Sequence, residues 1–129
     1  MATTVTTIYD KSWEILAWVQ CSGAESAQTV FDASALRGAG TNPRLAITLL
    51  EWNAAAVATS IAIIADATSD DTLMTVYGTG KMNHPNFKLL NPETAGCTGD
   101  ILVTTTGAAN FLIRAVKTAG YGDGIQAYN

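Results

Sequence analysis

Hydrophobic and polar residues alternate with a period of two along several short stretches of the chain. Over residues 13–21, the odd-numbered positions carry Trp, Ile, Ala, Val and Cys. This alternation predicts a strand with one apolar face. A helix is the alternative, because several of these residues also fall near one helical face. The strand is favoured, since Ser22 and Gly23 interrupt the chain after a strand-like length.

Residues 44–52 predict a strand of a different kind. Leu and Ile occupy both alternating faces at its centre. A strand with two apolar faces is typical of the centre of a sandwich, where both sides are covered.

The rest of the chain divides into short strand-like and turn-like pieces. Strands are expected at residues 3–9 (or an extended arm), 60–65, 73–77, 100–106 and 111–118, and residues 29–32 form a short apolar-polar piece. Less regular structure is expected at residues 36–43 (a loop), 53–59 (a loop or one helical turn), 66–71 (a turn), 81–99 (a long irregular stretch) and 119–129 (a tail). The strands at 100–106 and 111–118 are interpreted as the two arms of a hairpin.

Seven or eight short strands separated by turn signals predict the fold class. Residues 1–129 are expected to form one all-β domain, an antiparallel β-sandwich or jelly roll with extended termini. Residues 1–8 would be an N-terminal arm and residues 119–129 a C-terminal tail. An irregular stretch as long as 81–99 is usually functional or packed against a partner.

The composition is low in charge. Asp, Glu, Lys and Arg make up 14% of the 129 residues, against about 25% in a typical soluble domain. The polar surface must therefore come mainly from Thr, Ser, Asn and Gln, or much of the surface must be covered by something else.

The sign and distribution of charge exclude two classes of partner. The net charge is −4, and no cluster of Lys and Arg is present, so neither nucleic acid nor an anionic membrane surface is an expected partner. The weakly polar run at 54–67 is too short for a transmembrane helix, and the first residues do not resemble a secretory signal. Cys21 and Cys97 are then expected to be reduced, buried thiols.

Candidate catalytic residues are few. His84 precedes a proline and is the one histidine, and no nucleophile motif accompanies it. Cys97 lies in a Gly-rich segment but matches no nucleophile signature, so a buried structural role is expected. No enzymatic activity is predicted.

Metal and phosphate sites are also not expected. Asp66, Asp70 and Asp71 cluster in one segment, but their spacing is that of a turn and not of an EF-hand. Residues 78–81 (Gly-Thr-Gly-Lys) lack the spacing of a phosphate loop. No cofactor is predicted.

Three tryptophans, Trp13, Trp18 and Trp52, leave a sugar-binding platform open as an alternative to core packing. Trp13 and Trp18 would lie on opposite faces of one strand, so at most one of them is expected to be exposed.

The second half of the chain carries a family resemblance. It lies in the run Arg44–Trp52, the segment 60–67, the turn at 77–80, Phe87 and Leu89, the string Thr-Gly-Asp-Ile-Leu-Val-Thr-Thr-Thr-Gly at 98–107, and the strand at 111–117. Over residues 45–117 the chain resembles small head decoration (cement) proteins of tailed bacteriophages, which have a β-sandwich fold. The Gly- and Tyr-containing tail departs from the family pattern.

The resemblance implies a structural virion protein that is made in the host cytoplasm and bound to the outer surface of the phage head. Its partner would be the major capsid protein, and it would act as a homo-oligomer, with a trimer expected. Contacts are assigned to the N-terminal arm, the loop at 81–91 and the tail. The assigned residues are Thr3, Thr4, Val5, Thr6, Thr7, Ile8, Lys81, Met82, Asn83, His84, Phe87, Tyr121 and Tyr128.

Two other functions remain as alternatives. One is a receptor- or carbohydrate-binding module on the virion or tail, which requires an exposed Trp platform. The other is a small hydrolase, which requires His84 within reach of Cys97 or a serine.

Overall fold

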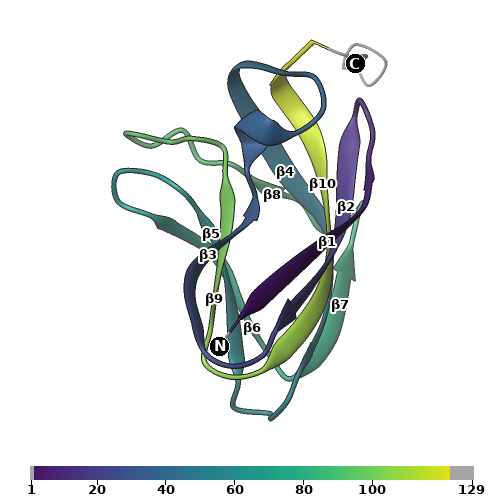
Figure 1. Cartoon of the computed structure of the whole chain (residues 1–129), viewed down its shortest axis with the longest axis vertical. Coiled ribbons are helices and arrows are strands. Elements are labelled where there is room, and N and C mark those ends of the chain that lie inside the picture. Colours follow the sequence, from purple (N-terminus) through teal and green to yellow (C-terminus); the bar gives the residue numbers. More distant parts are fainter. Residues whose placement is uncertain (1, 123–129) are drawn as a thin grey trace.

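The structure is a computed structural model and describes residues 2–122 (Figure 1). Within this range the chain forms ten strands and one short 3-10 turn. They are β1 (Thr3–Asp10), β2 (Glu14–Cys21), β3 (Glu25–Phe31), η1 (Ala33–Ala35), β4 (Ala39–Ala54), β5 (Ser60–Ala65), β6 (Asp71–Tyr77), β7 (Thr79–Asn83), β8 (Leu89–Leu90), β9 (Ile101–Thr105) and β10 (Ala109–Tyr121). In this part of the chain no helix has the length and apolarity to span a membrane.

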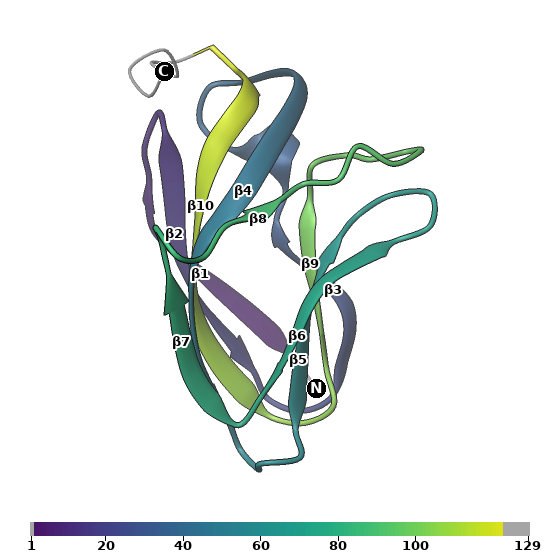
Figure 2. The same ribbon diagram turned by 180° about the vertical axis from the view of Figure 1, so that it is seen from behind.

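Two antiparallel sheets pack face to face (Figures 1 and 2). The first has the strand order β1-β2-β10-β4-β7, with β8 also paired to β4, and the second has the order β3-β9-β5-β6. Among the described strands the chain changes sheet six times: between β2 and β3, β3 and β4, β4 and β5, β6 and β7, β8 and β9, and β9 and β10. This is the strand order of a jelly roll, so the predicted all-β sandwich is confirmed.

The apolar positions of β2 and β4 form much of the core between the sheets. Ile15, Ala17 and Val19 of β2 are buried, as their period of two predicts. In β4 every residue from Leu45 to Leu50 is buried, so the expectation of a strand covered on both faces is also confirmed.

The predicted loop at 36–43 is wrong in its second half. Residues from Ala39 onward belong to β4, and Ala39 pairs with Tyr121 of β10. Gly, Asn and Pro in this segment are typical of turns, but the long strand β10 provides a partner for them. Gly120 (φ 77°) permits the close approach, because a Cβ there would overlap the backbone of Asn42 and Pro43.

The predicted hairpin between residues 100–106 and 111–118 is also wrong. Both strands exist, but β9 lies between β3 and β5 in one sheet, whereas β10 lies between β2 and β4 in the other. Three successive residues of β9 are buried: Ile101, Leu102 and Val103. Successive residues point to opposite faces of a strand, so β9 needs cover on both faces, which a central strand has and a hairpin arm with one exposed face lacks.

The strand interpretation of residues 3–9 is confirmed: they belong to an edge strand, β1, which pairs with β2 and is not an extended arm. Two further segments are more regular than predicted. Part of the irregular stretch at 81–99 forms the end of β7 and all of β8. The first residues of the predicted tail extend β10 to Tyr121, and residues 123–129 lie outside the described part.

Both cysteine thiols are free, as expected. Cys21 is buried in the core, and burial raises the pKa of its thiol. The expected burial of Cys97 is wrong, since this residue is only half-buried. Its Sγ donates a hydrogen bond to Asn91 Oδ1 at 2.7 Å.

A buried ammonium group holds one end of the sandwich together. The Nζ of Lys117 in β10 donates to Asp10 Oδ1 at 2.6 Å, to Lys11 O at 2.6 Å and to Arg37 O at 2.8 Å. Its side chain is 0% exposed, and Nζ also lies 5.1 Å from the centre of the Tyr121 ring. One charge thus joins the β1–β2 turn, the segment before β4 and the central strand β10.

At the other sheet, Asp100 ties the start of β9 to η1. Its Oδ1 accepts a hydrogen bond from Ala33 N at 2.8 Å. Burial raises the pKa of the Asp100 carboxyl, and the nearby carboxylates of Asp32 and Asp66 raise it further, whereas the Ala33 hydrogen bond lowers it. The net direction is upward, so ionised Asp100 is disfavoured in the folded state.

We expect Lys117→Met to lower the free energy of unfolding by about 3 kcal/mol, because it leaves the Asp10 carboxylate and two carbonyl groups without their shared donor. Lys81→Met is the matched control. Lys81 and Glu51 are 59% and 52% exposed and 3.7 Å apart, so its effect should stay below about 1 kcal/mol. Urea unfolding of both variants measures the difference, and equal losses would contradict the role assigned to Lys117.

Asp100→Asn keeps an oxygen that can accept the hydrogen bond from Ala33 N but replaces the titratable carboxyl with a neutral amide. With its raised pKa, folded Asp100 binds a proton more tightly than the unfolded chain does. Wild-type stability relative to the variant should therefore fall as pH rises above the ordinary value of 3.8, then level off above the folded pKa. Unfolding free energies of both proteins across the acidic range measure this difference. A difference that is constant or grows with pH would contradict it.

Candidate functional site

Strand β1 leaves one backbone edge of the larger sheet unpaired. It pairs with β2 on one side, and no strand in residues 2–122 pairs with its other side. From Thr3 to Ile8 the strand contains only Thr, Val and Ile. Natural edge strands are often protected by Lys, Pro or a β-bulge. Neither Lys nor Pro occurs from Thr3 to Ile8, and the one irregularity of the ladder lies between Thr7 and Tyr9, so residues 3–7 form a regular edge. The edge is therefore open to pairing with another chain.

The pattern of the ladder identifies which N–H groups face outward. Ser22 N donates to Ala2 O at 3.0 Å, so these two residues form a hydrogen-bonded pair. Because such pairs alternate along an antiparallel ladder, the register places Thr4 and Thr6 in hydrogen-bonded pairs with β2. The N–H groups of Thr3, Val5 and Thr7 then point toward the free edge.

Side-chain contacts fix both ends of this edge strand. Near its start, Thr3 Oγ1 donates to Glu25 Oε1 at 3.0 Å, which links β1 to the first strand of the other sheet. At its end, Asp10 accepts from Lys117 at 2.6 Å and from Arg37 N at 2.8 Å. The edge is therefore held in place before any partner arrives, which lowers the entropy cost of binding.

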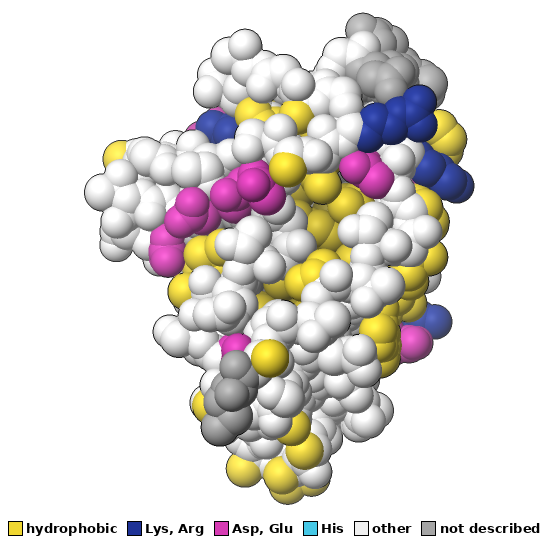
Figure 3. Space-filling model, in the orientation of Figure 1, with side chains coloured by type: hydrophobic (Ala, Val, Ile, Leu, Met, Phe, Trp, Pro, Cys, Tyr) yellow, Lys and Arg dark blue, Asp and Glu magenta, His cyan; other side chains and the backbone are white. Residues whose placement is uncertain are grey.

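The outer face of the larger sheet carries an uncharged polar row. Successive registers align one residue from each of five strands: Thr4, Gln20, Asn110, Asn53 and Thr79. Figure 3 shows the side of the molecule on which β1 lies; there the acidic and basic side chains gather in a few places, and uncharged surface lies between them. Amides and hydroxyls can enter an interface at a lower desolvation cost than charges.

A hollow of about 430 Å³ lies beside this row. It is lined by Trp18, Glu51, Trp52, Asn53, Thr79, Gly80, Lys81 and Asn110. Trp18 is partly exposed, whereas Trp52 is buried and its Nε1 donates to Tyr77 O at 3.0 Å. Gly80 is required beside it, because a Cβ there would overlap the Trp52 ring.

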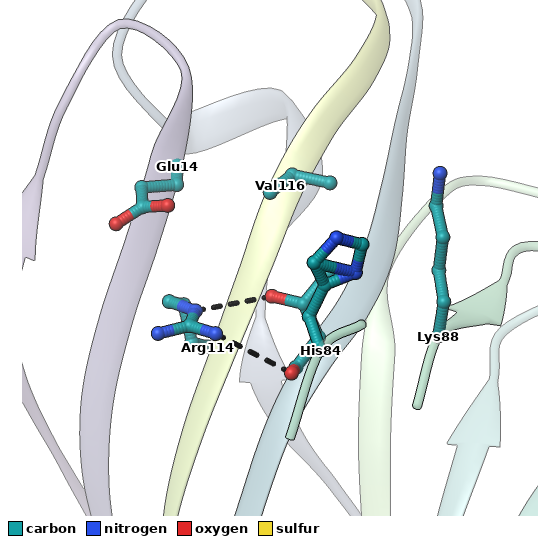
Figure 4. A pocket seen from close by; sticks show the side chains of 6 residues that line it. Glu14, His84, Lys88, Arg114 and Val116 are labelled. Atoms are coloured by element: carbon teal, nitrogen blue, oxygen red, sulfur yellow. Dashed lines mark hydrogen bonds between the residues drawn. The ribbon is translucent and has the colours of Figure 1, made fainter. Parts of the chain in front are cut away.

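A second hollow, of about 230 Å³, lies further along the same face (Figure 4). Glu14, Arg114, Val116 and Thr48 come from three strands, and His84 and Lys88 come from the segment between β7 and β8. Arg114 Nε donates to Thr48 Oγ1 at 3.1 Å, and its Nη2 donates to Asn83 Oδ1 at 2.7 Å. Glu14 accepts a hydrogen bond from the Tyr9 hydroxyl. These bonds hold the Arg114 and Glu14 side chains in fixed positions.

The constellation required by the hydrolase alternative is not assembled. Within the described residues, no hydrogen bond joins the His84 side chain to Cys97 or to a serine; Cys97 Sγ bonds to Asn91. His84 is exposed, and its backbone N donates to Thr48 O at 2.8 Å. Among residues 2–122, no Cys or Ser side chain is therefore hydrogen-bonded to the imidazole of His84.

Each of the three aspartates of the calcium hypothesis accepts a hydrogen bond from within residues 67–98. Asp66 accepts from Thr98 Oγ1, Asp70 from Ala67 N and Asp71 from Thr94 Oγ1. Among residues 2–122 no group of acidic, His or Cys side chains has the arrangement of a metal site. These carboxylates stabilise the β5–β6 turn and its neighbouring loop.

Two residues assigned to capsid contacts are buried instead. Phe87 and Tyr121 are 8% and 3% exposed and belong to the core, and Tyr121 Oη donates to Ala33 O at 2.8 Å. Burying these large aromatic side chains stabilises the folded state more than leaving them at the surface would. The remaining described candidates lie in β1, in β7 or, for His84, at the second hollow. Tyr128 lies outside the described residues.

Sequence reasoning did not find the two hollows. Trp18 is one of the three candidate tryptophans, but its neighbours in the hollow (Asn53, Thr79 and Asn110) come from strands far apart in the chain. Arg114 was likewise not singled out. The alternation of β10 places Asn110, Leu112 and Arg114 on one face. This pattern is the one sequence signal that points to these residues without knowledge of the strand order.

Comparisons with protein-family models, curated proteins and solved structures find no match to this chain.

Proposed function

We propose that the protein is a structural component of a tailed-phage particle, a decoration protein that binds the outer surface of the assembled head. The free edge of β1 is the attachment element. It adds to a strand of the major capsid protein and so extends the larger sheet across the boundary between two molecules. The proposal combines the resemblance of residues 45–117 to such proteins with the geometry of this edge.

The free edge of β1 from Thr3 to Thr7, before the irregularity at Thr7–Tyr9, is the observation that carries the proposal. Its outward N–H groups, at Thr3, Val5 and Thr7, form a row that a partner strand can pair with. Exposed Thr4, Thr6 and Thr7 add hydroxyls without adding charge. An edge of this kind favours a protein whose partner covers it, because an exposed one promotes aggregation.

The low charge of the whole chain supports a lattice-bound state. Charged residues are 14% of the sequence, and interfaces are depleted of charge at their centres. Repeated binding sites on a shell provide avidity, so each contact can be weak. A homotrimer at a symmetry axis of the lattice is the assembly that we propose, and it would stabilise the shell by binding the assembled form.

Thr7→Pro tests the edge directly. The substitution removes an N–H that faces the free edge but leaves the bonds between β1 and β2, and a proline is tolerated at such edge positions. We expect binding to heads that lack this protein to weaken by about tenfold or more, since one pairing bond is lost and the ring obstructs its neighbours. A co-sedimentation assay measures the affinity.

Thr7→Val is the matched control, because it changes the same side chain and keeps the N–H. It loses one exposed hydroxyl and no backbone donor, so its binding should weaken by less than about threefold. Both variants should unfold within about 1 kcal/mol of the wild type. Unchanged head binding by a folded Thr7→Pro protein would exclude β1 pairing as the mode of attachment.

A further inference from the structure

We infer that the hollow beside Trp18 is a binding site for a neutral saccharide. This site is separate from the free edge of β1, so it adds a function to the proposed attachment and does not depend on it. Its chemistry comes from one aromatic platform, two side-chain amides with free hydrogen-bonding groups, and a balanced charge pair.

Trp18 provides the platform. Its position in β2 directs the side chain to the outer face of the sheet, since Ile15, Ala17 and Val19 occupy the core face. The indole is partly exposed, and its register partner on β10 is Leu112. A flat apolar ring at the side of a hollow is suited to the C–H face of a pyranose.

Asn53 and Asn110 provide directional polar groups. Thr79 Oγ1 donates to Asn53 Oδ1 at 2.8 Å, which fixes the amide and leaves its NH₂ group available. No residue of the described chain makes a hydrogen bond to the Asn110 side chain. Each amide combines donors with an acceptor, the combination that can pair with neighbouring hydroxyl groups of a sugar.

The charge at the hollow indicates a neutral ligand. Glu51 and Lys81 are the two charged residues in the lining, and they lie 3.7 Å apart. Their charges offset one another, so neither an anion nor a cation is favoured, while the Glu51 carboxylate can still accept hydrogen bonds from hydroxyls. The volume of about 430 Å³ lies within the range of about 300–1,000 Å³ that is common for small-molecule sites.

A glycan array that carries neutral and acidic oligosaccharides tests the inference on the full chain. We expect saturable binding of at least one neutral glycan, confirmed by calorimetric titration with that glycan. Trp18→Ala should lower the affinity by about tenfold or more, because the stacking surface is removed. Asn110→Ala should lower it by about fivefold, since one side chain's hydrogen bonds are lost.

Trp13→Ala is the matched control. Trp13 is also partly exposed but does not line the hollow, so glycan affinity should be unchanged. Far-UV circular dichroism and head binding should be retained by Trp18→Ala, which separates this inference from the proposed attachment.

The inference is overturned if the wild type binds no neutral glycan saturably or prefers acidic glycans. Equal losses of glycan affinity in Trp13→Ala and Trp18→Ala would also overturn it. So would a changed sedimentation coefficient of the free Trp18→Ala protein with unchanged glycan affinity. The last would identify a second copy of the chain as the occupant.

Discussion

The buried ammonium group of Lys117 is the interaction that ties the edge strand β1 to the centre of its sheet. A charge with 0% exposure is costly unless it is fully partnered, and Lys117 reaches three oxygens that belong to Asp10, Lys11 and Arg37. These partners lie at the β1–β2 turn and before β4. The position of β1, the outermost strand, is therefore fixed by a residue on the central strand β10.

The two proposed roles use different parts of the same sheet. Attachment uses the backbone groups of β1, which any strand of suitable length can pair with, so specificity must come from the side chains beside them. Saccharide binding uses the side chains of Trp18, Asn53 and Asn110, which the register of three strands brings together. A partner paired to β1 extends the sheet sideways and leaves its outer face open.

Much of the fold could be predicted because burial leaves a local record in the sequence. The period of two over residues 13–21 and the two apolar faces of residues 44–52 identify β2 and the centre of β4. Local patterns do not specify partners, however. The segment at 39–43 has turn-like residues but pairs with β10, and the short link between β9 and β10 crosses between sheets instead of closing a hairpin. The hollow at Trp18 could not be predicted for the same reason, since it requires the strand order.

An electron cryo-microscopy map of the intact particle tests the central claim most directly. The account predicts copies of this protein on the outer surface of the head, at symmetry-related positions, with β1 continued by a strand of the capsid protein on its free side. Copies elsewhere in the particle, no copies at all, or a bound copy whose β1 edge faces solvent would contradict it.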